Sequence, residues 1–240
     1  MDIVVTFKES IEVAKKNPLI FVPPVAVGLV MAVLTMALIG GAMTTAGMAG
    51  GMGSPAGAMG AVGAALGLAA LLGIVGMIAG LVAHGMAVAM AQEAVATGTS
   101  TLNAGLQIAI SRLAQLVVAA VLVGLAVAIG TMLLVIPGII AGILFMFTFV
   151  IVIADNISAV DAMKKSFELV KSNIGDLVIF IIAAIGIGIV VSIVNMILNK
   201  VPVLGHLASS ILTGILWGYM TIVIVKVYTG LTTKIRTELT

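Results

Sequence analysis

Long apolar stretches without charge alternate along the chain with short segments that carry nearly all of the charged residues. A helix needs about 20 apolar residues to cross the hydrocarbon core of a bilayer. Six stretches reach this length, at approximately 18–40, 61–91, 113–135, 136–154, 174–198 and 204–227. The pattern predicts an all-α integral membrane protein, a bundle of six membrane-spanning helices. Pro137-Gly138 predicts a tight turn just before the fourth span, which then continues without a charge as far as Asp155.

A different pattern follows the fourth span, over residues 157–173. Apolar residues recur there at helical spacing, at Ile157, Val160, Met163, Phe167, Val170 and Ile174. The five charges between them would cost about 2.5–3.5 kcal/mol each at the bilayer centre, against a gain of about 0.5 kcal/mol per apolar side chain. We therefore expect an amphipathic helix that lies in the membrane interface. Similar patterns predict interfacial helices over 2–17 and 102–113.

The basic residues are distributed unevenly over the two sides of this layout. Ten of the eleven lysines and arginines fall on the side of the termini, and only Lys200 falls on the opposite side. By the positive-inside rule, both termini and the three interfacial helices are expected in the cytoplasm of a cell that carries the protein in its cell membrane.

Composition narrows the function classes. The 240 residues are 62% hydrophobic and 8% charged, and the mean hydropathy is +1.36, which excludes an ordinary soluble domain. The absence of cysteine removes thiolate metal sites and cysteine nucleophiles. A net charge of +2 gives no argument for nucleic acid. Without a phosphate-binding glycine loop, a metal-ligand spacing or a catalytic triad, we expect neither an enzyme nor a cofactor.

The succession of interfacial helix, span, proline-containing turn and span occurs three times in what we interpret as a single membrane domain. The units cover approximately 1–91, 92–155 and 156–240, and Ser10 and Asn17 correspond to Ser166 and Asn173 at one constant offset. Since each unit crosses the membrane twice, three parallel repeats would be related by an axis along the membrane normal. Chance recurrence of such helices and turn prolines is the alternative.

His84 is the ionisable residue deepest in the predicted spans, and such residues are functional candidates. It either lines a proton or ion pathway or makes a hydrogen bond across a close helix contact. Ser192, Asn195 and Asn199 share one face of the fifth span. Ser209, Ser210 and Thr213 lie at the same depth in the sixth span. These six side chains would line an outward-facing polar vestibule or serve as interhelical hydrogen bonds.

Small and soft residues give two further expectations. The pairs Gly63/Gly67 and Gly76/Gly80 predict close approach of another helix. The charge-free segment 41–60 predicts an external loop rich in glycine, alanine and methionine. Four methionines in this segment could serve as thioether ligands for monovalent copper. The alternative is that they only reflect the high methionine content of the chain. They are Met43, Met48, Met52 and Met59.

Membrane lipids are the partners that the sequence indicates most directly. Lysines on the predicted interfacial helices would meet anionic headgroups at about 1 kcal/mol each. These lysines are Lys15, Lys16, Lys164, Lys165 and Lys171. A homo-oligomer is left open by the sequence.

One stretch resembles a family signature. IPGI, a span and then ADNISAVDAMKKSFELVKSN are similar to uncharacterised prokaryotic multi-span proteins related to the membrane domain of glycerophosphoryl diester phosphodiesterases. The matching positions are Pro137, Gly138, Asp155, Ala162, Ser166, Lys171 and Asn173. The catalytic barrel that some relatives carry is missing, so the resemblance implies a fold and a link to lipids, but no activity.

Taken together, these patterns predict a channel or carrier for a small or lipidic solute. The alternative is a non-transporting scaffold or lipid-organising protein. Transport requires a continuous polar path, and the predicted spans contain few polar groups, which favours a hydrophobic cargo or none.

Overall fold

The computed structural model describes residues 3–48 and 55–238, and within these ranges it contains helices and turns but no strand. The side chains of 39–48, 55–59, 61–62, 64–65 and 235–238 lie outside this description. The elements are α1 (Ile3–Lys16), the 3-10 helix η1 (Pro18–Phe21), α2 (Val22–Met48), α3 (Pro55–Thr97), α4 (Leu102–Ser111), α5 (Leu113–Leu133), α6 (Val135–Leu144), α7 (Thr148–Ala154), α8 (Ala159–Ser172), α9 (Ile174–Leu198) and α10 (Leu204–Glu238).

Six helical segments in the described part of the chain are long and apolar enough to cross a membrane. They are Pro18–Leu38, Leu66–Thr97, Leu113–Leu133, Val135–Ala154, Ile174–Leu198 and Leu204–Lys234. The prediction of an all-α chain with six apolar helices of spanning length is confirmed, and the protein is a multi-pass membrane protein by this criterion.

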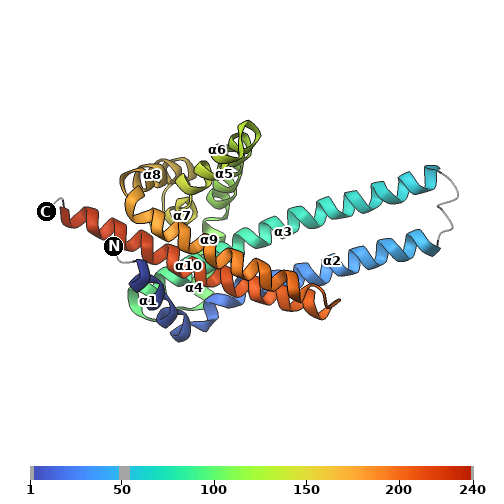
Figure 1. Ribbon diagram of the computed structural model, residues 1–240, viewed down its shortest axis with the longest axis horizontal. Helices are drawn as coiled ribbons and strands as arrows, with labels where there is room; N and C mark the ends of the chain where they lie inside the picture. The colour runs from blue at the N-terminus through green and yellow to red at the C-terminus, as the bar shows by residue number, and fades with distance from the viewer. Residues whose placement is uncertain (1–2, 49–54, 239–240) are drawn as a thin grey trace.

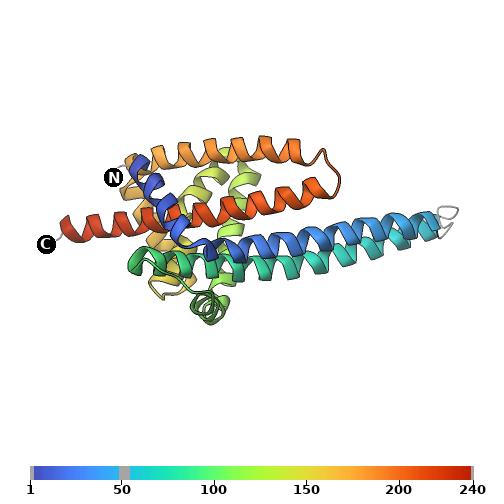
Figure 2. The ribbon, with the colours of Figure 1, turned by 90° about the horizontal axis from the view of Figure 1, so that it is seen from below.

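The short helices and both termini lie at one end of the molecule, and the long helical hairpins extend from that end. Figure 1 shows the two termini and the short helices α1, α4 and α8 at this end. The hairpins α2–α3 and α9–α10 run away from it side by side, and α10 packs against both α2 and α3 (Figures 1 and 2). The α5–α6 hairpin leaves the same end in a steeply different direction (Figure 1).

The fourth span differs from the prediction in two places. The turn before it lies at Leu134, and Pro137 sits in the first turn of α6, where its missing N–H is not needed for the helix. The span is also not continuous, because α6 ends at Leu144 and α7 begins at Thr148. Residues 145–147 form a turn within the membrane-length segment.

The predicted external loop 41–60 is shorter than expected. Helix α2 continues to Met48, and α3 begins at Pro55, so that helix replaces loop over most of the segment. Alanine and methionine favour helix strongly enough to offset the glycines between them. Of the methionines proposed as copper ligands, Met52 lies outside the described residues, as do the side chains of Met43, Met48 and Met59.

The best-packed region lies toward the end that carries the termini. Side chains from four different helices are fully buried there, for example Val88, Ile151, Val170 and Ile222. Farther along the hairpins the apolar side chains are exposed, such as Leu66 with 66% of its surface accessible. An apolar surface of this kind is what a helix presents to lipid.

Close backbone contacts between helices occur at other glycines than the predicted ones. A Cβ on Gly63, Gly67 or Gly80 would meet nothing within 4 Å, and one on Gly76 would meet only the Met31 side chain. Tight backbone contacts lie between α10 and α2, where a Cβ on Gly214 would come within 2.7 Å of the Val25 Cα, and between α5 and α6, where a Cβ on Gly130 would come within 2.9 Å of the Gly138 Cα. Gly76 therefore does face another helix as predicted, whereas Gly63, Gly67 and Gly80 do not, because approach depends on what the partner helix presents.

Candidate functional site: a cavity among the spans

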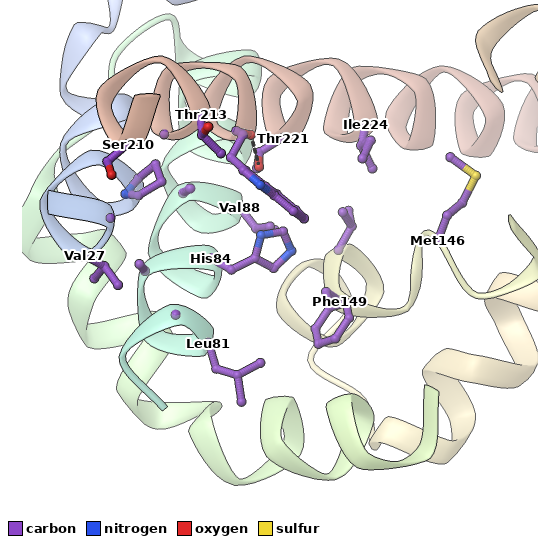
Figure 3. A pocket seen from close by; sticks show the side chains of 18 of the residues that line it. Val27, Leu81, His84, Val88, Met146, Phe149, Ser210, Thr213, Thr221 and Ile224 are labelled. Carbon is purple, nitrogen blue, oxygen red and sulfur yellow. Dashed lines mark hydrogen bonds between the residues drawn. The ribbon is translucent and has the colours of Figure 1, made fainter. Parts of the chain in front are cut away.

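A cavity of about 820 Å³ lies among the spans, and its volume is in the range of small-molecule sites. Helices α2, α3, α5, α9 and α10, together with α6, α7 and the turn between them, supply its walls. Figure 3 shows side chains of α3, α7 and α10 converging on this space. Its apolar lining includes Val27, Leu81, Val88, Val123, Phe145, Met146, Phe149 and Ile224.

The structure brings most of the predicted polar residues together on this cavity. The lining includes His84, Asn195, Asn199, Ser209, Ser210 and Thr213. Ser192 is the exception, since it is exposed on α9 and does not belong to the described lining residues. His206, which precedes Ser209 by one helical turn, is a lining residue as well. The functional role of these residues stays a prediction, but their proximity is now a structural fact.

Several of these polar groups are paired with one another between α9 and α10. The Asn195 side-chain amide donates to Thr213 Oγ1 at 3.1 Å, and Ser209 Oγ donates to Asn199 Oδ1 at 3.0 Å. Such pairs hold adjacent helices together in an apolar environment. The same groups therefore line the cavity and link the two helices that form its wall.

His84 occupies the point where α3, α7 and α10 meet. Its ring is half-buried and lies edge-on to Phe149 at 5.4 Å and to Trp217 at 6.1 Å between ring centroids. Figure 3 shows the imidazole directed into the cavity next to Phe149. Neither ring nitrogen has a hydrogen-bond partner among the described side chains and backbone groups. The expected interhelical hydrogen bond is thus not seen there, and the imidazole remains able to bond to a molecule in the cavity.

The lining carries no aspartate, glutamate, lysine or arginine among the residues that the structure describes. A charged ligand would lose its hydration in this cavity without meeting an opposite charge, which is costly. An uncharged molecule that is largely apolar and has a few hydrogen-bonding groups meets no such penalty. The described residues also contain no group of three or more histidine, cysteine, aspartate or glutamate side chains that could hold a metal ion.

The broken span shapes one wall of the cavity. Phe145 and Met146 lie in the turn between α6 and α7 and line the cavity. Ser166 of α8, which is fully buried, bonds to the backbone at the two ends of this turn, at Leu144 and Phe147. No proline interrupts residues 138–154, so the break could not be predicted from a helix-breaking residue.

Asp155, just after α7, joins this region to α10. Its carboxylate accepts a hydrogen bond from the Tyr228 hydroxyl at 2.8 Å and pairs with Lys165 of α8 at 2.5 Å. The Lys165 Nζ also lies 5.8 Å from the centre of the Tyr228 ring. These contacts fix α8 against the broken span and against α10.

The lysines that were expected to meet lipid headgroups fall into two groups. Lys165 pairs with Asp155, and Lys15 pairs with Glu12 at 2.9 Å. The hydrogen bond from Lys15 lowers the pKa of Glu12, so that the carboxylate stays ionised to a lower pH than a free glutamate would. Three others, namely Lys16, Lys164 and Lys171, form no close ion pair with a carboxylate within the described ranges, although the charge of Lys16 also lowers the pKa of Glu12 and Lys171 Nζ lies 6.0 Å from the centre of the Phe167 ring. Their charges are the ones available to a membrane surface.

Sequence reasoning missed a ridge of small residues on α10. Ser210, Gly214 and Gly218 recur every four residues and face α2 and η1, where Gly28, Val25 and Phe21 lie in contact. The spacing itself was a readable signal. This ridge of small residues determines how closely α2 approaches α10, and both helices contribute to the cavity wall.

Comparison with known proteins gave no match to a family model, to a curated protein or to a solved structure.

Proposed function

We propose that the protein is a membrane carrier or channel whose cavity takes a small uncharged or lipidic solute. The observation that carries this proposal is the gathering of six predicted polar side chains on one cavity whose described lining has no aspartate, glutamate, lysine or arginine. A solute with a polar group and an apolar body fits such a lining.

The distribution of polar groups favours one orientation of that solute. Asn199, His206 and Ser209 lie near the α9–α10 turn, whereas Val88, Met146 and Ile224 lie deeper. His84 is the polar side chain that faces this deeper part without a partner of its own in the described chain. The proposed solute therefore places its main polar end toward the α9–α10 turn and its apolar part toward Val88, Met146 and Ile224, with His84 available to a further hydrogen-bonding group.

We also propose the three-repeat organisation, and the first and third units support it. Helices α1 and α8 have the same length of 14 residues, and both their starts and their ends are offset by the spacing that separates Ser10 from Ser166. Both serines are fully buried. Asn17 donates to the carbonyl four residues before it, and Asn173 does the same.

The packing of the short helices supports all three units. Helix α4 packs mainly on α3, α8 mainly on α7, and α1 mainly on α10. In each case the short helix of one unit rests on the last span of the preceding unit, and α1 on α10 closes the cycle. The different direction of α5–α6 makes any threefold relation approximate (Figure 1).

The proposed orientation places the short helices in the cytoplasmic interface. Ion pairs at their end of the molecule support this placement, among them Lys226 with Glu9 at 2.6 Å and Lys234 with Asp176 at 3.5 Å. Charge is tolerated at a membrane surface and is costly within the hydrocarbon core. We also propose that the chain is related to the membrane domain of glycerophosphoryl diester phosphodiesterases, as the stretch around Asp155 suggests.

A scaffold without transport is the second candidate. It is favoured by the Asn195–Thr213 and Ser209–Asn199 pairs, because polar groups that bond to each other have less need of a ligand. The buried Asn195 Oδ1 has no partner within the described part of the chain, and this favours the carrier or channel instead. The two candidates differ in whether a molecule enters the cavity.

Gly80 offers the sharpest test of that difference. It lines the cavity, and a Cβ there would meet nothing within 4 Å, so Gly80→Leu would fill space without displacing the backbone. Gly73→Leu is the matched control, since Gly73 lies two turns earlier on α3, has equally open space and is not among the described lining residues.

Two measurements apply to these variants. Trp217 lines the cavity and is the only tryptophan of the chain, so a brominated long-chain alcohol that binds there should quench its fluorescence. Vesicles containing the protein are also tested for flux of glycerol, a short-chain diacylglycerol and potassium. Carrier or channel function predicts quenching and flux of an uncharged probe, both lost in Gly80→Leu and kept in Gly73→Leu. Flux no greater than in empty vesicles, with equal quenching in both variants, would contradict transport and support the scaffold.

A further inference from the structure

A second hollow shares the lining residue Phe145 with the cavity. It is a groove of about 460 Å³ between α5, the turn that follows α6, and α8. Most of its described lining is apolar, from Leu122, Phe145, Val160, Met163 and Phe167. Val160 and Phe167 are exposed, so the groove is open to the surroundings of α8.

Two opposite charges stand at this groove. Lys164 and Glu168 both line it, both are exposed, and they lie four residues apart on α8. Although this spacing allows an ion pair, neither side chain has a charged partner among the residues with described side chains. A lysine that precedes a glutamate by four residues is the less favourable order in a helix. Both charges are therefore available to a ligand.

We propose that this groove binds one molecule of a zwitterionic phospholipid whose headgroup carries a primary amine. The phosphate meets the Lys164 ammonium, and the lipid ammonium meets the Glu168 carboxylate. An acyl chain lies against Phe145, Met163 and Phe167. The charge pattern of the groove matches this headgroup in sign at both ends.

Other abundant lipids match the groove less well. A purely anionic headgroup would satisfy Lys164 but would bring a negative charge next to Glu168, which is repulsive. A quaternary ammonium headgroup has the right charges but lacks the N–H groups that form a charge-assisted hydrogen bond with a carboxylate. The primary amine is the chemistry that uses both side chains.

A lipid in the groove would touch the broken span. Phe145 lines both the groove and the cavity, so the two hollows share this residue. Met163 and Phe167 belong to the helix that also holds Ser166 against the turn. The bound lipid therefore packs against the segment that forms one wall of the cavity. The proposal does not require that the cavity itself takes a ligand.

The test uses the full chain, delipidated in detergent, and measures bound lipid by native mass spectrometry. Phosphatidylethanolamine, phosphatidylglycerol and phosphatidylcholine with identical acyl chains serve as probes. The variants are Lys164→Ala and Glu168→Gln. Lys200→Ala and Glu12→Gln are the controls, because they remove the same charges at positions away from the groove. Thermal unfolding of each variant verifies that it is folded.

Wild type should bind phosphatidylethanolamine about tenfold more tightly than the other two lipids, as expected for one additional hydrogen bond to a charged group. Lys164→Ala should lose about tenfold in affinity for this lipid, and Glu168→Gln should remove its preference over phosphatidylglycerol. Both controls should behave as wild type. Equal binding of the three lipids, or a preference that survives in Glu168→Gln, would overturn the proposal.

Discussion

Ser166 Oγ donates a hydrogen bond to the Leu144 carbonyl at 2.8 Å, between residues 22 apart in sequence. The same oxygen accepts a hydrogen bond from the Phe147 amide at 3.2 Å. Breaking a helix in an apolar environment frees backbone groups that must find other partners. One buried serine on α8 supplies both partners, and this joins the surface helix α8 to the cavity wall formed by Phe145 and Met146.

Ser166→Ala should therefore lower the free energy of unfolding by about 1–3 kcal/mol, because two buried backbone groups lose their partner. Ser10→Ala is the matched control. Ser10 is also fully buried, but it donates to the Thr6 carbonyl within its own helix, so its loss should cost less than about 1 kcal/mol. Equilibrium unfolding in mixed micelles measures both variants. If both variants lost the same free energy of unfolding, the two hydrogen bonds of Ser166 would contribute no more than the single bond of Ser10.

The Asp155 carboxylate should matter more than its lysine partner. Asp155→Ala would remove the acceptor of the buried Tyr228 hydroxyl and cost about 1–3 kcal/mol. Lys165→Ala would remove only a partly exposed ion pair, worth about 0–1 kcal/mol. Tyr228→Phe, measured in the same unfolding assay, should reduce the cost of Asp155→Ala. The explanation is wrong if Lys165→Ala destabilises the protein as much as Asp155→Ala does.

Gly214 and Gly63 should respond to alanine with opposite signs. Gly214→Ala would push a methyl group into the Val25 backbone and cost about 1–3 kcal/mol. Gly63 has nothing within 4 Å of a Cβ, so Gly63→Ala should stabilise α3 by about 0.5–1 kcal/mol. Thermal unfolding in detergent distinguishes these signs. A neutral Gly214→Ala would mean that the α2–α10 contact is looser than described.

What the sequence could predict depends on how local the physics is. Span length and hydropathy are properties of a whole segment, so they predicted the six apolar helices even where the predicted ends were wrong. The same properties hide a three-residue turn in the fourth span, because residues 145–147 are as apolar as their neighbours. Its partner, Ser166, is distant in sequence and could not be paired with it by spacing.

The candidate site shows the same division. Matching depth in two adjacent spans was enough to bring Asn195 and Thr213 together. Phe149 and Trp217, which flank His84, were not identified, since an aromatic residue in an apolar run gives no signal of its own. Gly76 and Gly80 were assigned to helix contacts by their spacing, whereas Gly80 instead leaves open space in the cavity wall.

The most direct test of the layout is side-specific labelling of single cysteines, which is feasible because the chain has none of its own. The informative positions are Lys8, Lys164 and Lys234 near the short helices, and Leu134 and Lys200 at the two hairpin turns. An impermeant maleimide applied to intact cells should label Leu134→Cys and Lys200→Cys. It should reach the other three only after the membrane is opened. Labelling of Leu134→Cys from the same side as Lys164→Cys would contradict the account, because the α5–α6 hairpin would then not cross the membrane.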